Sequence, residues 1–436
     1  MPSLWYIGMM LVSMLMLFGL QSEPVWAQST ASDQTILRSQ RLLLRTSRNA
    51  TLYYRLGDAY IQKARESGDI TYITLAEEAL QKCLEIAPAH SGAARHLAYA
   101  MYMRHGFDEA AIQAQQAVEL DPRDSHAYGI LGDAYLEVGK YAEAAHVYQR
   151  MIQLQGDLYA YSRQSGLKSL WGDMDGAIAD LQQAIRLGQA QHRPPESIAW
   201  AMWQLGNEYL AHGKLPEAEA QYLDALRTFP NYYRALAGLA QLRAAQQRYP
   251  EAIELYQKAM AIVPWPDYAV ALGDVYTKLG RAEEARQQFD LVEYIGYLNT
   301  LNKVLYNREL AYFYADHERT LPAALDLARR ELEVRRDIYA YDVLAWALYK
   351  NDQPREALAA MVEALKLGTK DARLFFHAGM IHHRLGESAT ARDYLRRALA
   401  TNPYFHVLHV EVAERTLKEI EVRLGMAVIQ EKTDDR

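Results

Sequence analysis

Histidines are the side chains in this sequence with the clearest capacity for chemistry, because imidazole is the commonest transition-metal ligand. His377, His382 and His383 fall on one predicted helix, and His406 and His409 lie about one turn apart on the next. Spacings of five and six residues do not bring His377 onto one clean face with the other two, and no carboxylate completes an obvious set. The pattern favours surface or packing histidines, so we expect no metal and no cofactor.

Other signatures of catalysis are missing from the sequence. Cys83 is the only cysteine, which excludes an intramolecular disulfide and a cysteine-based zinc site, and we expect it to be buried and inert. There is no Gly-rich phosphate loop, no nucleophile elbow and no outstanding carboxylate pair. We therefore expect a protein that is not an enzyme. Turnover that is lost on changing a carboxylate such as Asp133 would argue otherwise.

Charge is spread evenly along the chain, with 47 Lys and Arg against 54 Asp and Glu and no block of like charge. This balance gives no electrostatic footprint for nucleic acid. Between Tyr306 and Leu367, however, charges lie close to apolar positions. They indicate either a buried polar network between structural units or a solvated face. These charges are Arg308, Glu309, Arg329, Arg330, Glu331, Arg335, Arg336, Asp337 and Asp342.

The first residues predict export. Leu4–Leu20 is an uncharged apolar run, and Val25-Trp26-Ala27 after a polar break fits a cleavage site, so a mature chain would begin at Gln28. The run is preceded by no Lys or Arg and approaches the length of a membrane span. We expect a periplasmic or secreted protein, with an anchor formed by residues 4–20 as the alternative and a buried helix as the third.

A ladder of small and aromatic residues recurs along most of the chain. Residues 125–155 show it most clearly, where Leu131 and Gly132 precede Tyr135, Ala144 and Tyr148 at fixed offsets. The small residue after the first Leu is called the marker here. Successive markers are 41, 34, 33, 41, 34, 33, 38, 34 and 34 residues apart, and the longer steps indicate extended helices or turns. The markers are Gly57, Ala98, Gly132, Ser165, Gly206, Ala240, Gly273, Ala311, Ala345 and Gly379.

Each unit contains two apolar-periodic segments of helical spacing, split by Gly or a polar turn such as Gly139-Lys140. Small residues at the marker let helix backbones approach closely, and the aromatics fill the space between units. Because one helix pair cannot bury its own apolar face, the units must stack. The sequence therefore predicts an all-α array.

This pattern resembles the tetratricopeptide repeat family from about Ala50 to Pro403. The resemblance implies a right-handed superhelical α-solenoid of about ten helix-turn-helix repeats. We expect a signal peptide or anchor at 1–27, a linker and capping helix at 28–49, repeats 1–7 at 50–303, repeats 8–10 at 304–403, and a C-terminal capping helix with a charged tail at 404–436.

In the resembling family, the first helix of each repeat lines a concave groove. A groove rich in Tyr and Trp with scattered charges suits an extended peptide or a partner helix, although many of these aromatics could instead pack between helices. Some family members bind the C-terminal carboxylate of a partner with a Lys and an Asn one helical turn apart. Here Trp203 replaces that Lys before Asn207, so we do not expect recognition of that kind of partner tail. The expected partner-binding residues are Tyr54, Asp58, Arg95, Tyr99, Tyr102, Asp133, Trp203, Asn207, Asp274, Lys278, Arg308, Tyr312, Trp346, Tyr349 and Arg384.

These observations predict a non-catalytic scaffold or adaptor that binds a peptide or protein partner of the cell envelope in its groove. Two alternatives stay open. A membrane-anchored assembly factor would pellet with membranes after carbonate extraction, and a carbohydrate or small-ligand binder would bind a glycan array without binding peptide.

Overall fold

The computed structural model describes residues 30–301 and 307–434, so the predicted signal segment at residues 1–27 lies outside the described residues. Within these two ranges the chain forms 22 α-helices, numbered α2 to α23, and no strand. The predicted all-α class is confirmed.

Twenty of these helices form ten antiparallel pairs, α3 with α4 through α21 with α22, and the two helices of a pair pack mainly on each other. The first helices are α3 (Ala50–Ser67), α5 (Ser91–Met103), α7 (Ser125–Glu137), α9 (Leu158–Leu170), α11 (Pro195–Ala211), α13 (Tyr233–Ala245), α15 (Pro266–Lys278), α17 (Asn307–Asp316), α19 (Ile338–Lys350) and α21 (Ala372–Arg384). The second helices are α4 (Thr71–Ile86), α6 (Phe107–Leu120), α8 (Tyr141–Leu154), α10 (Met174–Ala190), α12 (Leu215–Thr228), α14 (Tyr249–Ile262), α16 (Ala282–Leu301), α18 (Leu321–Val334), α20 (Pro354–Ala364) and α22 (Ser388–Thr401).

Every marker lies on the first helix of its pair, and the glycine markers face a side chain of the second helix. A Cβ added at Gly132 would come within 2.3 Å of the ring of Tyr148, and one added at Gly273 within 2.3 Å of the ring of Phe289. Ala98 at the same position has no exposed surface. Small markers are thus required because a side chain of the second helix occupies the space of a larger one; it is an aromatic ring at Gly132, Gly206 and Gly273, and a leucine at Gly57 and Gly379.

The turn inside each of the last nine pairs has the same backbone conformation. The seventh residue after the marker has a positive φ in all nine, for example 76° at Gly139 and 58° at Asp352. A residue in this left-handed conformation ends the first helix and turns the chain, and glycine adopts it without steric cost. The longer marker steps do not come from this turn but from longer helices. Helices α3, α10, α11 and α16 contain 18, 17, 17 and 20 residues.

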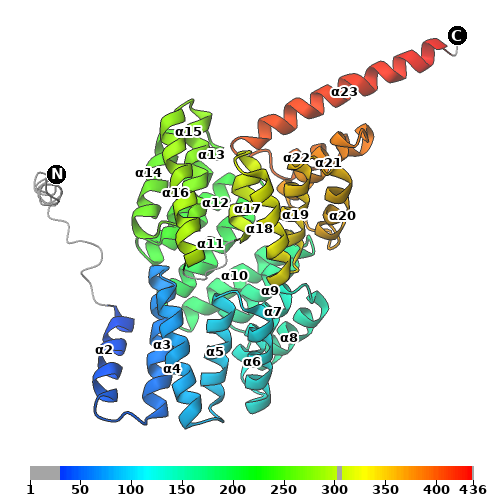
Figure 1. Ribbon diagram of the computed structural model, residues 1–436. Coiled ribbons are helices and arrows are strands. Elements are labelled where there is room, and N and C mark those ends of the chain that lie inside the picture. Colours follow the sequence, from blue (N-terminus) through cyan, green and yellow to red (C-terminus); the bar gives the residue numbers. More distant parts are fainter. Residues whose placement is uncertain (1–29, 302–306, 435–436) are drawn as a thin grey trace, which may run out of the picture.

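The ten pairs wind into a superhelix whose successive turns touch, so that repeats far apart in sequence lie side by side (Figure 1). The backbone N–H of Ile338 donates to the hydroxyl of Tyr141 at 2.8 Å, and the backbone N–H of Arg336 donates to the Glu137 carbonyl at 2.8 Å. The Thr369 hydroxyl likewise donates to the Leu170 carbonyl. Repeats 3 and 4 are therefore bridged to repeats 9 and 10.

Helices α2 (Ala31–Leu43) and α23 (His409–Asp434) flank the array. A capping box between Thr30 and Asp33 starts α2, so within the predicted linker and capping helix at 28–49 the helix begins at Ala31. The first half of α23 buries Ala413 and Ile420, and the rest projects away from the body (Figure 1). No helix in the described ranges combines the length and apolar character that crossing a membrane would need.

Candidate functional site

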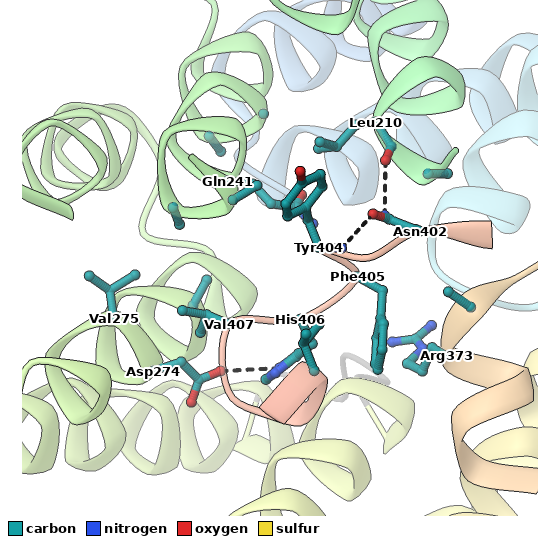
Figure 2. Close-up of a pocket in the computed structure, with 18 of the residues that line it drawn as sticks. Leu210, Gln241, Asp274, Val275, Arg373, Asn402, Tyr404, Phe405, His406 and Val407 are labelled. Atoms are coloured by element: carbon teal, nitrogen blue, oxygen red, sulfur yellow. Dashed lines mark hydrogen bonds and ion pairs between the residues drawn. The ribbon is translucent and has the colours of Figure 1, made fainter. Parts of the chain in front are cut away.

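A cavity with a volume of about 790 Å³ lies inside the superhelix. Its walls come from the first helices α11, α13, α15 and α21, and one side is formed by the chain between α22 and α23 (Figure 2). This cavity is called cavity 1 here. Its lining includes Trp203, Arg234, Asp267, Asp274 and Arg373. Aromatic, cationic and acidic groups therefore line the same cavity.

The segment Asn402–Leu408, called the strap here, crosses cavity 1 without helical structure (Figure 2). The side-chain amide of Asn402 donates to the Leu210 carbonyl at 2.9 Å and accepts from the Tyr404 backbone N–H at 2.8 Å. Nε2 of His406 lies 3.3 Å from a carboxylate oxygen of Asp274. The strap is thus a peptide segment of this chain that is held inside its own superhelix by backbone and side-chain contacts.

A smaller cavity of about 490 Å³, called cavity 2 here, is lined by α5, α7, α9 and α11 and shares Arg234 with cavity 1. The Arg234 guanidinium lies 5.2 Å from the ring of Trp203, 5.3 Å from that of Tyr233 and 5.1 Å from that of Trp265. Cation–π contacts of this length hold the arginine in place, and one hydrogen bond joins its side chain to that of Tyr233. Of its five N–H donors, most are left to bind an acceptor. Among the described residues Arg234 forms no ion pair with a carboxylate.

The acidic groups of cavity 1 differ in protonation. Burial, and then the charge of Glu309, raise the pKa of Asp267 to about 7, against the opposing effect of Arg308, Arg373 and Arg234. Burial alone would also raise the pKa of Asp274, but hydrogen bonds from His317 and His406 outweigh it and lower that pKa to about 2. Of these two acidic groups in cavity 1, Asp274 therefore stays a carboxylate, and Asp267 exchanges a proton near neutral pH.

Seven of the fifteen predicted groove residues line the two cavities. Four of them line cavity 1 and three line cavity 2. The cavity 1 set is Trp203, Asn207, Asp274 and Lys278, and the cavity 2 set is Tyr99, Tyr102 and Asp133.

The other eight predicted groove residues lie elsewhere. Trp346 and Tyr349 are buried in the hydrophobic core, with 2% and 8% of their surface exposed. Arg384 forms an ion pair with Asp352 at 2.8 Å on the outside of the array. The remaining five belong to polar clusters between neighbouring first helices: Tyr54, Asp58 and Arg95 around His96, and Arg308 and Tyr312 beside Asp337 and Asp342.

The charged segment between Tyr306 and Leu367 is partly a buried network, as one of its two interpretations proposed. Arg335 bonds to Glu331 at 3.0 Å and to Glu137 of the preceding superhelical turn at 2.8 Å. Asp342, which has no exposed surface, accepts from Tyr312 at 2.6 Å. Arg329 and Arg330 are instead solvent-exposed. The network therefore joins superhelical turns and repeats, and only part of the segment is a solvated face.

The sequence register missed one row of cavity residues. These residues lie six positions before the marker, whereas the earliest predicted groove residues, such as Trp203 before Gly206, lie three positions before it. Extending the same helical face by one turn would have found them, because residues three to four apart share a face. This row is Tyr159, Trp200, Arg234, Asp267 and Arg373.

Comparisons with known proteins match the tetratricopeptide repeat at residues 50–90, 97–159, 204–264, 243–295 and 343–404, together more than half of the chain. The human protein O-mannosyl-transferase TMTC1 is 28% identical over 238 residues, covering 51% of this chain and 25% of that protein. TPR repeat-containing protein MJ1428 of Methanocaldococcus jannaschii is 22% identical over 387 residues, covering 82% of this chain and 64% of that one. The chain thus spans less than two thirds of either relative.

Solved structures also align with parts of the chain. The yeast Tom70 structure aligns with 93% of this chain and 96% of its own at 13% identity and a TM-score of 0.37. The structure of PilW, described as a type IV pilus biogenesis factor, aligns with 47% of this chain and 92% of its own at 18% identity and a TM-score of 0.40. With ten helix pairs, small markers in every first helix and repeat matches over most of the array, this chain belongs to the tetratricopeptide repeat family.

Proposed function

We propose that the chain is a non-catalytic scaffold that binds an extended peptide segment of a protein partner inside its superhelix, along the two cavities that meet at Arg234. The observation that carries this proposal is the strap, since a non-helical peptide segment already lies in cavity 1 with its backbone and side chains hydrogen-bonded to the first helices. A second peptide would find the same kinds of donors, acceptors and rings along cavity 2.

The chemistry of the lining supports a polar peptide with at least one acceptor or acidic group. Trp203, Trp265 and Tyr233 supply rigid contact area around Arg234, which is the pattern of residues that dominate peptide-binding interfaces. Since these rings already hold the guanidinium, little conformational freedom is lost when a partner oxygen binds to it.

We also propose that the partner belongs to the cell envelope and that the chain reaches it by export. The support is the apolar run Leu4–Leu20 followed by Val25-Trp26-Ala27. Mass spectrometry of the N-terminus of protein purified from its native cells tests this. A chain beginning at Gln28 in the soluble fraction supports export and cleavage, and an intact N-terminus in the membrane fraction supports the anchored form.

Site-specific photo-crosslinking in the native cells tests the binding proposal. A photoreactive amino acid placed at Gln241, which lines cavity 1, should crosslink the partner, whereas the same group at Val362, an outward position 60% exposed on α20, should not. Equal crosslinking from both positions would contradict binding inside the superhelix.

The crosslinked partner segment then provides a peptide for affinity measurements. Arg234→Leu should weaken its binding about tenfold, since a desolvated cation is worth about 1–2 kcal/mol. The matched control is Arg330→Leu, which removes an exposed guanidinium on α18. Unchanged affinity in Arg234→Leu would reject the assigned role of Arg234, and glycan binding in the absence of any peptide binding would favour the small-ligand alternative.

A further inference from the structure

Helix α2 ends the array on its N-terminal side and leaves apolar side chains uncovered. It packs mainly on α3, and Ile36 and Ser39 are buried on its inner side (Figure 1). The terminal unit of a repeat array ordinarily presents a polar face to solvent, because no further unit covers it. Here instead Leu37, Leu42 and Leu44 are 51%, 39% and 88% exposed. Three leucines thus lie in the open where a cap should be polar.

Three arginines lie among these leucines. Arg38 and Arg41 are on the side of α2 opposite to Ile36 and Ser39, since residues three or four apart share a face of a helix. Arg45 follows two residues after the helix ends. All three arginines are exposed, and among the described residues none of their guanidinium groups forms an ion pair. These three leucines and three arginines are called the outer face of α2 here.

The charge around the outer face of α2 is of one sign, although the whole chain is acidic on balance. Residues 30–56 contain five arginines and one acidic residue, Asp33. The carboxylate of Asp33 is paired with Lys63 at 2.8 Å, so it does not neutralise the arginines. The outer face of α2 therefore attracts anions, while its leucines favour an apolar environment.

We propose that the outer face of α2 binds the surface of a membrane that contains anionic phospholipids. The guanidinium groups reach the lipid phosphates, while the methylene chains of the arginines and the neighbouring leucines lie at the boundary with the acyl chains. A lipid surface thus satisfies both kinds of side chain at once. This site is separate from the two cavities and does not depend on peptide binding inside the superhelix.

Two other occupants fit the outer face of α2 less well. In a symmetric dimer the same face meets itself, so Arg38, Arg41 and Arg45 would lie against their own copies, and like charges in contact are unfavourable. A partner helix binds in a groove, whereas this face is the outer side of one terminal helix.

The position of α2 in the sequence also supports the proposal. Residues 21–30 separate the apolar run Leu4–Leu20 from Ala31, the first residue of α2. Ten residues of fully extended chain span at most about 36 Å. If the run is retained as an anchor, α2 begins within that distance of its end. If the run is cleaved, α2 supplies a membrane contact of its own.

An environment-sensitive fluorophore attached to the full-length chain tests the proposal. Cys83 has no exposed surface, so a cysteine introduced at an exposed position is labelled selectively. Gln34→Cys places the fluorophore on the exposed side of α2, and Ile112→Cys places it on α6, where Ile112 is 63% exposed. With phosphatidylcholine vesicles that contain phosphatidylglycerol, emission at position 34 should shift to the blue, and emission at position 112 should not. Vesicles of phosphatidylcholine alone should leave both unchanged.

A charge variant measures the contribution of the arginines. Arg38→Gln/Arg41→Gln/Arg45→Gln should raise the lipid concentration for a half-maximal shift on the order of 100-fold, because each arginine near an anionic surface contributes about fivefold. The matched control makes the same change in net charge at exposed arginines of α10, α20 and α23, and it should respond as the wild type does. This control is Arg186→Gln/Arg355→Gln/Arg415→Gln.

An apolar variant separates membrane contact from attraction of charge alone. Leu37→Ser/Leu44→Ser should weaken the shift while its dependence on phosphatidylglycerol remains, and circular dichroism checks that the variants stay folded. An equal shift with both kinds of vesicle, or an arginine variant that responds as the wild type does, would overturn the proposal. Absence of any shift would also overturn it and would favour an acidic protein as the occupant of this face.

Discussion

Two identical substitutions at helical glycines should change stability in opposite directions. Gly132→Ala places a methyl group on the face of α7 that packs on α8, at 2.3, 2.6 and 2.9 Å from three atoms of the Tyr148 ring. Gly166→Ala places the same methyl group on α9, where no heavy atom lies within 4 Å. The first tests the close approach on which every repeat depends, and the second is its control.

The expected magnitudes follow from the contacts of Tyr148. Its ring is 2% exposed and its hydroxyl donates to Asp133 at 2.6 Å, so the ring cannot swing away without losing that bond. Overpacking of this kind costs about 1–3 kcal/mol and the lost hydrogen bond about 1 kcal/mol, against a gain of about 1 kcal/mol from replacing a helical glycine. We expect Gly132→Ala to lower the free energy of unfolding by about 2 kcal/mol and Gly166→Ala to raise it by about 0.5–1 kcal/mol.

Urea unfolding followed by far-ultraviolet circular dichroism measures both variants, with the slope of the transition used to check that the extent of unfolding is unchanged. The two variants should differ by about 3 kcal/mol. Equal stability of the two variants, or a Gly132→Ala variant more stable than wild type, would refute the claim that the marker must be small because an aromatic ring occupies the space of its Cβ.

Two further predictions concern charge. Arg335→Met should lower the free energy of unfolding by on the order of 3 kcal/mol in urea titrations, because it leaves Glu331 buried without its cation. Arg336→Met, which removes a half-exposed ion pair, should lower it by less than about 1 kcal/mol. Burial, and then the charge of Arg95, lower the pKa of His96 to about 3 from 6.5. Below pH 6.5, His96 therefore binds a proton in the unfolded chain but stays neutral in the folded chain. The folded state consequently loses stability as the pH falls from 6.5 toward 3. Between pH 7 and pH 5 the loss should be about 2 kcal/mol larger in the wild type than in His96→Gln, and equal losses would contradict the pKa shift.

Local features of the fold could be predicted from the sequence because they depend on residues within one repeat. The marker Gly132 and its partner Tyr148 are 16 positions apart, and the positive φ at Gly139 follows from the same repeat. Interior-facing residues could be predicted in part, since one face of each first helix lines the cavities, as Asp133 and Asn207 do.

Features that depend on the pitch of the superhelix could not be predicted. Arg335 bonds to Glu137 across about two hundred residues, and no pattern within a repeat encodes that proximity. The strap could not be predicted for the same reason. Its position in cavity 1 requires Asn402 to lie beside Leu210, and that depends on the pitch of the superhelix over the repeats between them. His406 and His409 lie close together in the sequence, but the carboxylate beside them, Asp316, comes from two repeats earlier in the chain.

The bonds between successive superhelical turns have an evolutionary consequence. Linear repeat arrays commonly gain or lose whole units, because each unit interacts only with its neighbours. Here Tyr141 of repeat 3 must meet Ile338 of repeat 9, and Leu210 must meet Asn402. Deleting or duplicating a single unit between them would rotate every later unit past its partner. The number of repeats in this chain is consequently fixed by its geometry, and its descendants are expected to vary in side chains and loop lengths while retaining the count.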